Sequence, residues 1–257
     1  MSSSANGQTR LAILKVRARG GDFEFVYDFH EAESVREKVI VGWSGGKDSA
    51  LALYEILKTD KYEVLELLTT LTRDYDRISI HGVRRELLEK QAKSMRFPIE
   101  KMFISKSASN EEYEKELLRI LAEHRDERVF SVVFGDIFLE DVRKYREQML
   151  SRIGMKCIFP LWKKDTHELA RSFIDNGFKA VITNVDSNFL GKEFAGREFD
   201  ERFLQDLPSS VDPCGENGEF HSFVFDGPIF HERTSFTKGE IVLRENRFYY
   251  CDLIPTF

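Results

Sequence analysis

Ser44-Gly45-Gly46-Lys47-Asp48-Ser49 is the stretch from which the fold of this chain can be predicted. The apolar run Val39-Ile40-Val41 precedes it, and a second apolar run, 50–54, follows directly. This order predicts a buried strand, a tight turn and then a helix. Two adjacent glycines allow positive φ angles and a close approach to a ligand. Because the helix N-terminus offers N–H groups and a positive dipole end, and Lys47 adds a charge, we expect the turn to bind phosphate.

The loop departs from the commoner phosphate-binding pattern, in which four residues separate the first glycine from a Gly-Lys pair and Ser or Thr follows. Here the earlier candidate is Gly42, with three intervening residues, and Asp48 follows the lysine. This spacing argues against a kinase or a GTPase. The loop resembles instead the SGGKDS loop of the PP-loop ATP pyrophosphatases, which bind ATP and usually cleave it between the α and β phosphates. The alternative is a glycine-rich turn that only starts a helix, with its lysine and aspartate in solvent.

Composition and charge restrict the class of protein. The 257 residues suffice for one large domain or for a core domain with a smaller addition. A net charge of −6 argues against broad binding to nucleic acid. The three cysteines form no CxxC pair, which fits a reducing compartment. The start lacks the apolar core of a signal peptide, and no apolar stretch is long enough to span a bilayer. We therefore expect a cytoplasmic protein with no membrane partner.

From residue 38 onward, short apolar runs alternate with amphipathic helical patterns. The runs fall at 39–41, 64–68, 102–104, 129–134, 156–159 and 180–182. This alternation predicts a doubly wound, mainly parallel sheet with helices on both faces, an α/β fold of the Rossmann-like type. In such sheets ligands bind at the carboxyl ends of the strands. After about residue 186 the pattern changes to short strands and polar turns.

We therefore expect three parts. Residues 1–37 form an N-terminal extension, in which 11–16 and 23–27 could pair as a β-hairpin. Residues 38–186 form the PP-loop ATP-binding domain. Residues 187–257 form a smaller α+β substrate-binding domain, whose exposed strands could pair across a homodimer axis.

Polar groups are concentrated a second time in the loop 212–222, Asp-Pro-Cys-Gly-Glu-Asn-Gly-Glu-Phe-His-Ser. Two further carboxylates, an amide, an imidazole and a thiol follow its first aspartate within ten residues. Loops of this density often carry binding or catalytic residues. A turn-rich connector with solvated acids explains the composition about equally well.

Five motifs occur together in a fixed order. They are SGGKDS at 44–49, HGVR at 81–84, Gly-Asp-Ile at 135–137, Pro-Leu-Trp at 160–162 and GENGEFHS at 215–222. In this order and spacing they resemble the diphthine–ammonia ligase family of PP-loop proteins, over about residues 38–232. Members of that family join ammonia to a carboxylate on a modified histidine of a translation elongation factor. The resemblance implies an acyl-adenylate intermediate, with AMP and pyrophosphate as products.

The second loop differs from that family's usual pattern. The branch that makes diphthamide carries an EGGEYET-like loop, whereas residues 216–222 read ENGEFHS. This variant resembles a bacterial branch whose substrate has been linked to corrinoid salvage. We therefore expect an ATP-dependent, AMP-forming carboxylate–ammonia ligase, whose acceptor is a corrinoid-related compound or another carboxylate rather than diphthine. No glutaminase-like cysteine motif is evident, so free ammonia is the expected nitrogen donor.

The nucleotide is expected to contact the first motifs. Phosphate binding is assigned to Ser44, Gly45, Gly46, Lys47 and Ser49, with Lys47 also catalytic. Asp48 could bind Mg²⁺, which favours carboxylate and phosphate oxygens; it could equally be a first-turn acid that favours the helix dipole. His81 could touch the nucleotide or the substrate, or be a helix-start histidine bound only by backbone.

The remaining candidates lie at strand ends and in the second loop. Asp136 follows the apolar run 129–134 and is expected at the carboxyl end of a strand, in the site. Arg84, Glu140 and Arg143 are weaker candidates. For Glu216, Glu219 and His221 three roles stay open: holding the acceptor, orienting ammonia or acting as a general base. Asn217 could donate to the acyl oxygen.

Cys214 is either a nucleophile or a buried thiol. A zinc site of Cys, His and Glu lacks the paired spacing of structural zinc. Two other functions compete with the ligase: a PP-loop enzyme that modifies tRNA, and an ATP-binding sensor without catalysis. Unpaired cysteines argue against tRNA thiolation, and the acidic pI of about 5.7 offers little attraction for a nucleic-acid backbone. A sensor would have no need for the carboxylates and the imidazole of the second loop.

Overall fold

The structure is a computed structural model that describes residues 10–18, 21–29, 36–78 and 81–256. The chain divides into two units, Met1–Arg36 and Glu37–Phe257. In the first unit, β1 (Arg10–Ala18) and β2 (Gly21–Phe29) pair as antiparallel strands, with Arg10 opposite Phe29. All further description concerns the second unit.

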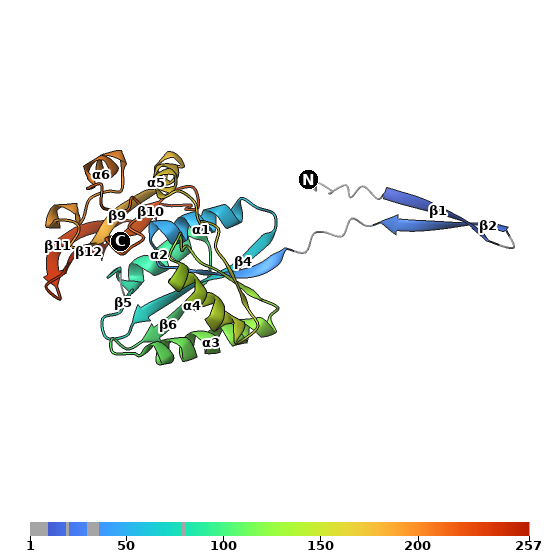
Figure 1. The fold of residues 1–257 in the computed structure, drawn as a ribbon, viewed down its shortest axis with the longest axis horizontal. Helices are drawn as coiled ribbons and strands as arrows, with labels where there is room; N and C mark the ends of the chain where they lie inside the picture. The colour runs from blue at the N-terminus through green and yellow to red at the C-terminus, as the bar shows by residue number, and fades with distance from the viewer. Residues whose placement is uncertain (1–9, 19–20, 30–35, 79–80, 257) are drawn as a thin grey trace. The chain divides into compact units, whose positions relative to one another are not determined.

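A six-stranded, mainly parallel sheet forms the centre of the second unit (Figure 1). Its strands are β3 (Glu37–Gly42), β4 (Tyr62–Thr72), β5 (Arg77–Ile78), β6 (Ile99–Ile104), β7 (Ser131–Val133) and β8 (Lys156–Ile158). The strand order is β5-β4-β3-β7-β8, and β6 pairs with β4. Every pair is parallel except β4 with β5. This sheet confirms the predicted α/β fold.

Helices cover both faces of this sheet. Successive residues of a strand point to opposite faces, so neighbouring residues of β3 show which helices lie on which face. Val39 and Val41 of β3 belong to one apolar cluster, with α1 (Lys47–Leu57) and α2 (Arg85–Met95). Ile40, between them, belongs to another, with α3 (Asn110–Asp126) and α4 (Glu140–Ser151). The sheet is therefore doubly wound.

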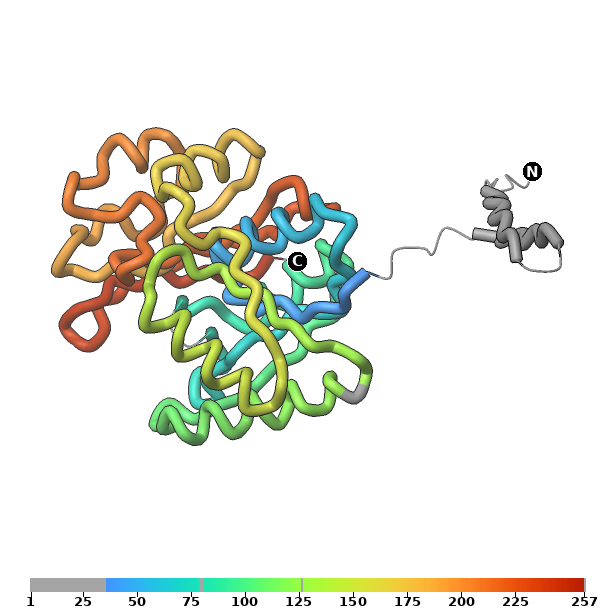
Figure 2. The backbone as a smooth tube through the Cα atoms, turned by 45° about the vertical axis from the view of Figure 1, so that its right-hand side comes forward, coloured from blue at the N-terminus to red at the C-terminus, as the bar shows by residue number. Residues whose placement is uncertain are grey.

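A second, antiparallel sheet has the strand order β10-β9-β12-β11. Its strands are β9 (Lys179–Asp186), β10 (Phe220–Asp226), β11 (Phe236–Arg244) and β12 (Phe248–Pro255). With them come α5 (Thr166–Asp175), a 3₁₀ turn η1 (Lys192–Phe194) and α6 (Glu201–Asp206). In Figure 2 the orange and red part of the tube, which contains β10 to β12, lies in the upper part of the view, and the green helix α3 lies at the bottom.

The strand β9 corrects one expectation. The apolar run 180–182 was expected to continue the parallel alternation, but β9 pairs antiparallel with β10 and β12. All of β9 except its first residue is buried. A strand covered on both faces has the same uninterrupted apolar pattern in either kind of sheet, so the pattern alone could not assign it.

The second sheet meets the first at the SGGKDS loop. The backbone N–H of Val224 in β10 donates to the carbonyl of Gly45 at 2.9 Å. Gln91 of α2, fully buried, also donates to that carbonyl and accepts from the indole of Trp43. The loop is thus held between α2 and β10. Among the described residues, every helix is too short or too polar to cross a membrane.

Candidate active site

The SGGKDS loop connects β3 to α1 and is packed too closely for side chains at its two glycines. Gly45 has a φ of +75°, and a Cβ there would lie 2.8 Å from Oε1 of Gln91. A Cβ on Gly46 would lie 2.8 Å from Cε1 of His81. The prediction that this turn needs glycine therefore rests on both conformation and space.

Hydroxyl and lysine contacts hold the start of α1. Oγ of Ser49 donates to the carbonyl of Gly46 at 2.9 Å, and Oγ of Ser44 lies 3.3 Å from Oγ of Ser49. The backbone N–H of Lys47 donates to Oγ of Ser222 in β10 at 3.1 Å. Nζ of Lys47 donates to both carboxylate oxygens of Asp48 at 2.8 Å. Burial is the largest single effect and disfavours the lysine charge, but Asp48, Cys214 and Glu216 together outweigh it, so the pKa of Lys47 lies above its ordinary value.

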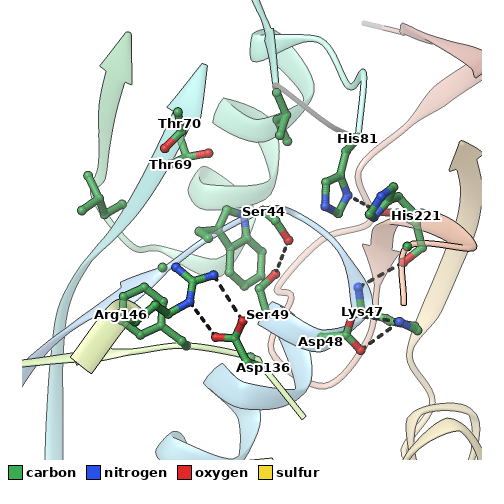
Figure 3. A pocket seen from close by; sticks show the side chains of 18 of the residues that line it. Ser44, Lys47, Asp48, Ser49, Thr69, Thr70, His81, Asp136, Arg146 and His221 are labelled. Carbon is green, nitrogen blue, oxygen red and sulfur yellow. Dashed lines mark hydrogen bonds and ion pairs between the residues drawn. The ribbon is translucent and has the colours of Figure 1, made fainter. Parts of the chain in front are cut away.

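The first cavity, of about 560 Å³, opens above this loop. It is bounded by the carboxyl-terminal parts of β3, β4 and β7 and by the loop before β10, as expected for an open α/β sheet. Figure 3 shows Lys47 and the two histidines on one side, and Asp136 with Arg146 on the other. The predicted site residues that line it are Ser44, Lys47, Asp48, Ser49, His81, Asp136, Glu216 and His221.

His81 and His221 form a pair of half-buried imidazoles, with ring centroids 4.7 Å apart. Nδ1 of His81 lies 3.1 Å from the carbonyl oxygen of Ser222. Because a carbonyl oxygen only accepts, this nitrogen carries the proton and Nε2 is left as an acceptor. Burial lowers the pKa of His81 to about 4, and burial together with His81 and Lys47 lowers the pKa of His221 well below its ordinary value. Both rings are therefore neutral at neutral pH.

Glu216 presents an unusual carboxylate to the first cavity. Its Oε1 accepts a hydrogen bond from the backbone N–H of Ile137 at 2.7 Å, which favours the charged form. Burial is the larger effect, and with the nearby charges of Asp48 and Asp136 it raises the pKa of Glu216 to about 7. Such a group can both lose and accept a proton near neutral pH.

Glu219 and Asn217 do not line the first cavity. Glu219 is 1% exposed, and its carboxylate accepts from the backbone N–H of Asp212 at 3.1 Å. It also accepts from the backbone N–H of Asn217 at 3.0 Å and from the side-chain amide of Asn217 at 2.9 Å. These contacts close the 212–222 loop on itself. Any catalytic role of Glu219 and Asn217 would therefore act through the shape of the loop.

Cys214 is also withdrawn from the cavity. Its Sγ donates to the carbonyl oxygen of Thr166 at 3.3 Å, and the residue is 1% exposed. Burial raises the pKa of the Cys214 thiol far above its ordinary value. A protonated, hydrogen-bonded thiol is a poor nucleophile, which supports the buried-thiol interpretation.

Arg146 is a cavity residue that sequence reasoning missed. Its Nη2 donates to Oδ1 of Asp136 at 3.3 Å, and Nε lies 2.9 Å from Oδ2 without hydrogen-bond geometry. Arg146 lies in α4, ten residues after Asp136. A separation of ten residues does not by itself predict a contact, so the ion pair could be recognised only once the position of α4 was known. Arg143 instead lies over the ring of Trp162 at 4.6 Å, outside the cavity.

Two other weak candidates also lie outside the first cavity. Glu140 faces Lys163 at 3.4 Å, and Arg84 binds Asp252 of β12 at 2.6 Å. The part of the chain that the structure describes contains no group of three His, Cys, Asp or Glu side chains placed for a metal ion. Asp48 lines the first cavity, beside the SGGKDS turn.

A doubly wound sheet whose first core strand runs into an SGGKDS turn defines a PP-loop protein of the ATP-pyrophosphatase class. The model of the diphthamide synthase N-terminal domain matches residues 37–157, and that of the C-terminal domain matches residues 165–253. The chain belongs to this diphthamide synthase, or diphthine–ammonia ligase, family.

Three relatives named diphthine–ammonia ligase share low sequence identity with this chain. The chain is 25% identical to that of Schizosaccharomyces pombe over 226 residues, which is 80% of this chain and 37% of the relative. Identity to the Danio rerio protein is 23%, over 79% of this chain and 88% of the relative. Identity to the Homo sapiens protein is 29%, over 50% of this chain and 49% of the relative. The chain thus spans about a third of the yeast relative's length, and the bacterial branch stays a prediction.

Proposed function

We propose that this chain is an ATP-dependent ligase that adenylates a carboxylate, releases pyrophosphate and transfers ammonia to the activated acyl group. The observation that supports this function best is the convergence of two loops on one cavity. Lys47 and Asp48 come from the SGGKDS loop, and Glu216 comes from the 212–222 loop. A phosphate-binding turn beside a carboxyl of pKa about 7 combines nucleotide binding with proton transfer.

In this proposal the triphosphate of ATP lies over the SGGKDS loop. Ser44, Gly45, Gly46, Lys47 and Ser49 hold its β and γ phosphates. Lys47 supplies a buried positive charge, and the start of α1 supplies a favourable dipole. Phosphate oxygens would compete with Asp48 for Nζ of Lys47, which frees the carboxylate.

Asp48 is the residue proposed to hold Mg²⁺, together with phosphate oxygens. This fits the preference of Mg²⁺ for one or two carboxylates plus substrate phosphates over a cage made of protein alone. When bound, the ion neutralises charge on the phosphates. Asp136, oriented by Arg146, faces the same cavity and is proposed to position the nucleotide side of the reaction.

The reaction has two bond exchanges. An oxygen of the acceptor carboxylate bonds to the α-phosphorus of ATP, and pyrophosphate leaves with the electron pair of the broken P–O bond. The lone pair of ammonia then attacks the acyl carbon, AMP leaves with the electron pair of the broken C–O bond, and the new amide nitrogen gives one proton to solvent. Ammonium must first lose a proton, and Glu216 is the proposed acceptor. The neutral rings of His81 and His221 orient N–H groups by accepting hydrogen bonds.

Two acceptors are candidates. Diphthine is the first compound to test, because it stands in the name of each relative reported above. The corrinoid-related acceptor, expected from the ENGEFHS variant, has no support among these relatives and is tested second.

The deciding experiment incubates the protein with ATP, Mg²⁺, ammonium and each candidate acceptor, and follows nucleotides, pyrophosphate and the amide. The expected result is AMP, pyrophosphate and amide in equal amounts, each dependent on the acceptor. Acceptor-dependent ADP and phosphate would contradict adenylation. ATP binding without turnover on any acceptor would favour the sensor instead.

A further inference from the structure

A second cavity, of about 790 Å³, adjoins the first and has no role in the site described so far. One wall is formed by the segment 72–78 and by the residues that follow β6, including Lys106. The other wall is one face of the β11–β12 hairpin. The alternating residues on that face are Glu240, Val242 and Arg244 of β11, and Tyr250, Asp252 and Ile254 of β12.

The position of this cavity in the fold indicates a ligand site. Thr72 and Ile104 are register partners at the carboxyl ends of the parallel strands β4 and β6, and both line the second cavity. The first cavity uses the same edge of the sheet, at β3 and β7. Carboxyl ends of parallel strands are where open α/β sheets bind ligands. Ile78 and Ile104 line both cavities, so the two spaces adjoin along this edge.

The HGVR segment, which the nucleotide site leaves largely unexplained, lies between the cavities. His81 lines the first and Gly82 the second. A Cβ on Gly82 would lie 2.7 Å from the ring of Tyr250, so this position must be glycine for the tyrosine to pack there. Arg84 binds Asp252 at 2.6 Å. The segment therefore joins the nucleotide side of the site to the β11–β12 hairpin.

The lining has the chemistry of a site for an amphipathic molecule. Arg77 in the lining and Arg84 just outside it share the carboxylate of Asp252. Lys106 lies 5.4 Å from the ring of Tyr75, and Arg244 lies 5.8 Å from the ring of Tyr250. Glu240 and Glu245 add negative charge at the rim. Aromatic surface with a few polar groups of both signs is typical of small-molecule sites of this size.

We propose that the second cavity binds the body of the acceptor, an amphipathic carboxylate, so that its carboxyl end extends past Ile78 and Ile104 to the nucleotide. The acceptor is either a free small molecule or a modified side chain of a protein, since both present the same chemistry. This proposal rests on the ligase function proposed above and adds where the acceptor lies. It assigns the HGVR segment a positioning role between the two substrates.

The direct test is protection from alkylation. Val242 faces the cavity opposite Tyr250, whereas its neighbour Leu243 points to the other face of the same strand and is 48% exposed. Val242→Cys and Leu243→Cys are treated with N-ethylmaleimide, and the rate at each position is followed by peptide mass spectrometry. The reaction is repeated with ATP and either the small-molecule or the protein fraction of cells that lack this gene and so accumulate the acceptor.

We expect one fraction to slow alkylation at position 242 by about tenfold, as for a site more than nine-tenths occupied, and to leave position 243 unchanged. The fraction that protects identifies the source of the acceptor. Unchanged alkylation at position 242 in both fractions overturns the second cavity as the acceptor site, whatever the turnover. Protection without any pyrophosphate release supports the cavity and overturns the ligase reaction instead.

A blocking pair gives an independent measurement. Val242→Trp fills the second cavity beside Tyr250, and Leu243→Trp adds the same bulk on the outer face. We expect Val242→Trp to lower acceptor-dependent pyrophosphate release about tenfold or more while affinity for a fluorescent ATP analogue changes less than about twofold. Leu243→Trp should preserve both. Full acceptor-dependent activity in Val242→Trp would overturn the proposal.

Discussion

The two loops that meet at the first cavity are held in different ways. The SGGKDS loop is held partly by its own hydroxyls, since Ser44 and Ser49 contact each other and the start of α1. It is also held by α2 and β10, which both donate to the carbonyl of Gly45. The 212–222 loop is held mainly within itself. Three N–H donors of the loop converge on the buried carboxylate of Glu219, and the carboxylate of Asp212 accepts from two further backbone N–H groups. The first can be predicted from a short stretch of sequence. The second depends on contacts that form only when the loop closes.

Lys47 joins the two loops: its backbone N–H donates to Ser222 at the end of the second loop, and its Nζ lies 5.4 Å from the centre of the Phe220 ring. The carboxyl of Glu216 also accepts from the backbone N–H of Ile137. A change that distorts the second loop should therefore alter the position of Glu216 and, more weakly, the start of α1. The predictions below separate these effects.

Lys47→Ala should give the largest loss. It removes the buried positive charge at the phosphate site, and we expect pyrophosphate release to fall about 10³-fold, as for loss of a preorganised charge at a reacting group. Lys58→Ala, at the exposed end of the same helix, is the matched control and should retain activity. Initial rates of pyrophosphate release give the activity of both variants, and far-UV circular dichroism shows whether each is folded. Comparable rates in the two variants would remove Lys47 from the site.

The fold was predictable where local pattern and final structure agree. The sequence around Lys47 predicts strand, turn and helix correctly, because all three are determined by neighbouring residues. The strand β9 was not assignable, because its neighbours in the sheet, β10 and β12, come from 34 or more residues away, from Asp186 to Phe220. Residues 180–182 contain no information on which strand they will pair with.

Glu219→Ala should destabilise the fold, because it removes the buried carboxylate that accepts from the part-buried N–H groups of Asp212 and Asn217. We expect the free energy of unfolding to fall by about 3 kcal/mol, the scale of losing charged hydrogen bonds and leaving donors unpaired. Glu219→Gln keeps an acceptor oxygen and should cost less. Urea unfolding of the three proteins gives the comparison. If Glu219→Ala were as stable as the parent but inactive, Glu219 would act in catalysis and not in closing the loop.

Glu216→Gln should change activity and its pH dependence more than stability. The folded-state pKa of about 7 lies above the ordinary 4.5, so the parent should gain activity as pH rises through about 7 and Glu216 ionises. The Gln variant should lose about 100-fold and show no such rise, as for loss of a general base. A raised carboxyl pKa also means that the stability favoured by the protonated form is present below pH 4.5 and is lost as pH rises to about 7.

The measurement for Glu216 is the pH profile of kcat/KM, with stability followed across the same range. Glu147→Gln, on the surface of α4, is the control and should keep the parent profile. An inflection near pH 7 that persists in Glu216→Gln would assign the proton transfer to another group.

The site was less predictable than the fold. Sequence spacing treats Glu216 and Glu219 alike, yet one faces the first cavity and the other is buried in its own loop. Arg146 was missed because its contact with Asp136 depends on how α4 packs beside the end of β7. The place of Lys47 on the cavity wall could be predicted, because it follows from the turn that contains the residue. Residues whose surroundings come from distant segments need the structure to be assigned.

Cys214→Ser should have the smallest effect. The hydroxyl can replace the thiol as donor to the carbonyl of Thr166, and burial keeps the thiol protonated, so no nucleophile is lost. We expect activity within about twofold of the parent and a change in unfolding free energy below about 1 kcal/mol, the usual size for one neutral hydrogen bond. Cys214→Ala, which lacks the donor, separates packing from hydrogen bonding. If both variants folded normally but lost activity completely, Cys214 would have to form a covalent intermediate, and the 212–222 loop would be catalytic at its thiol and not at Glu216.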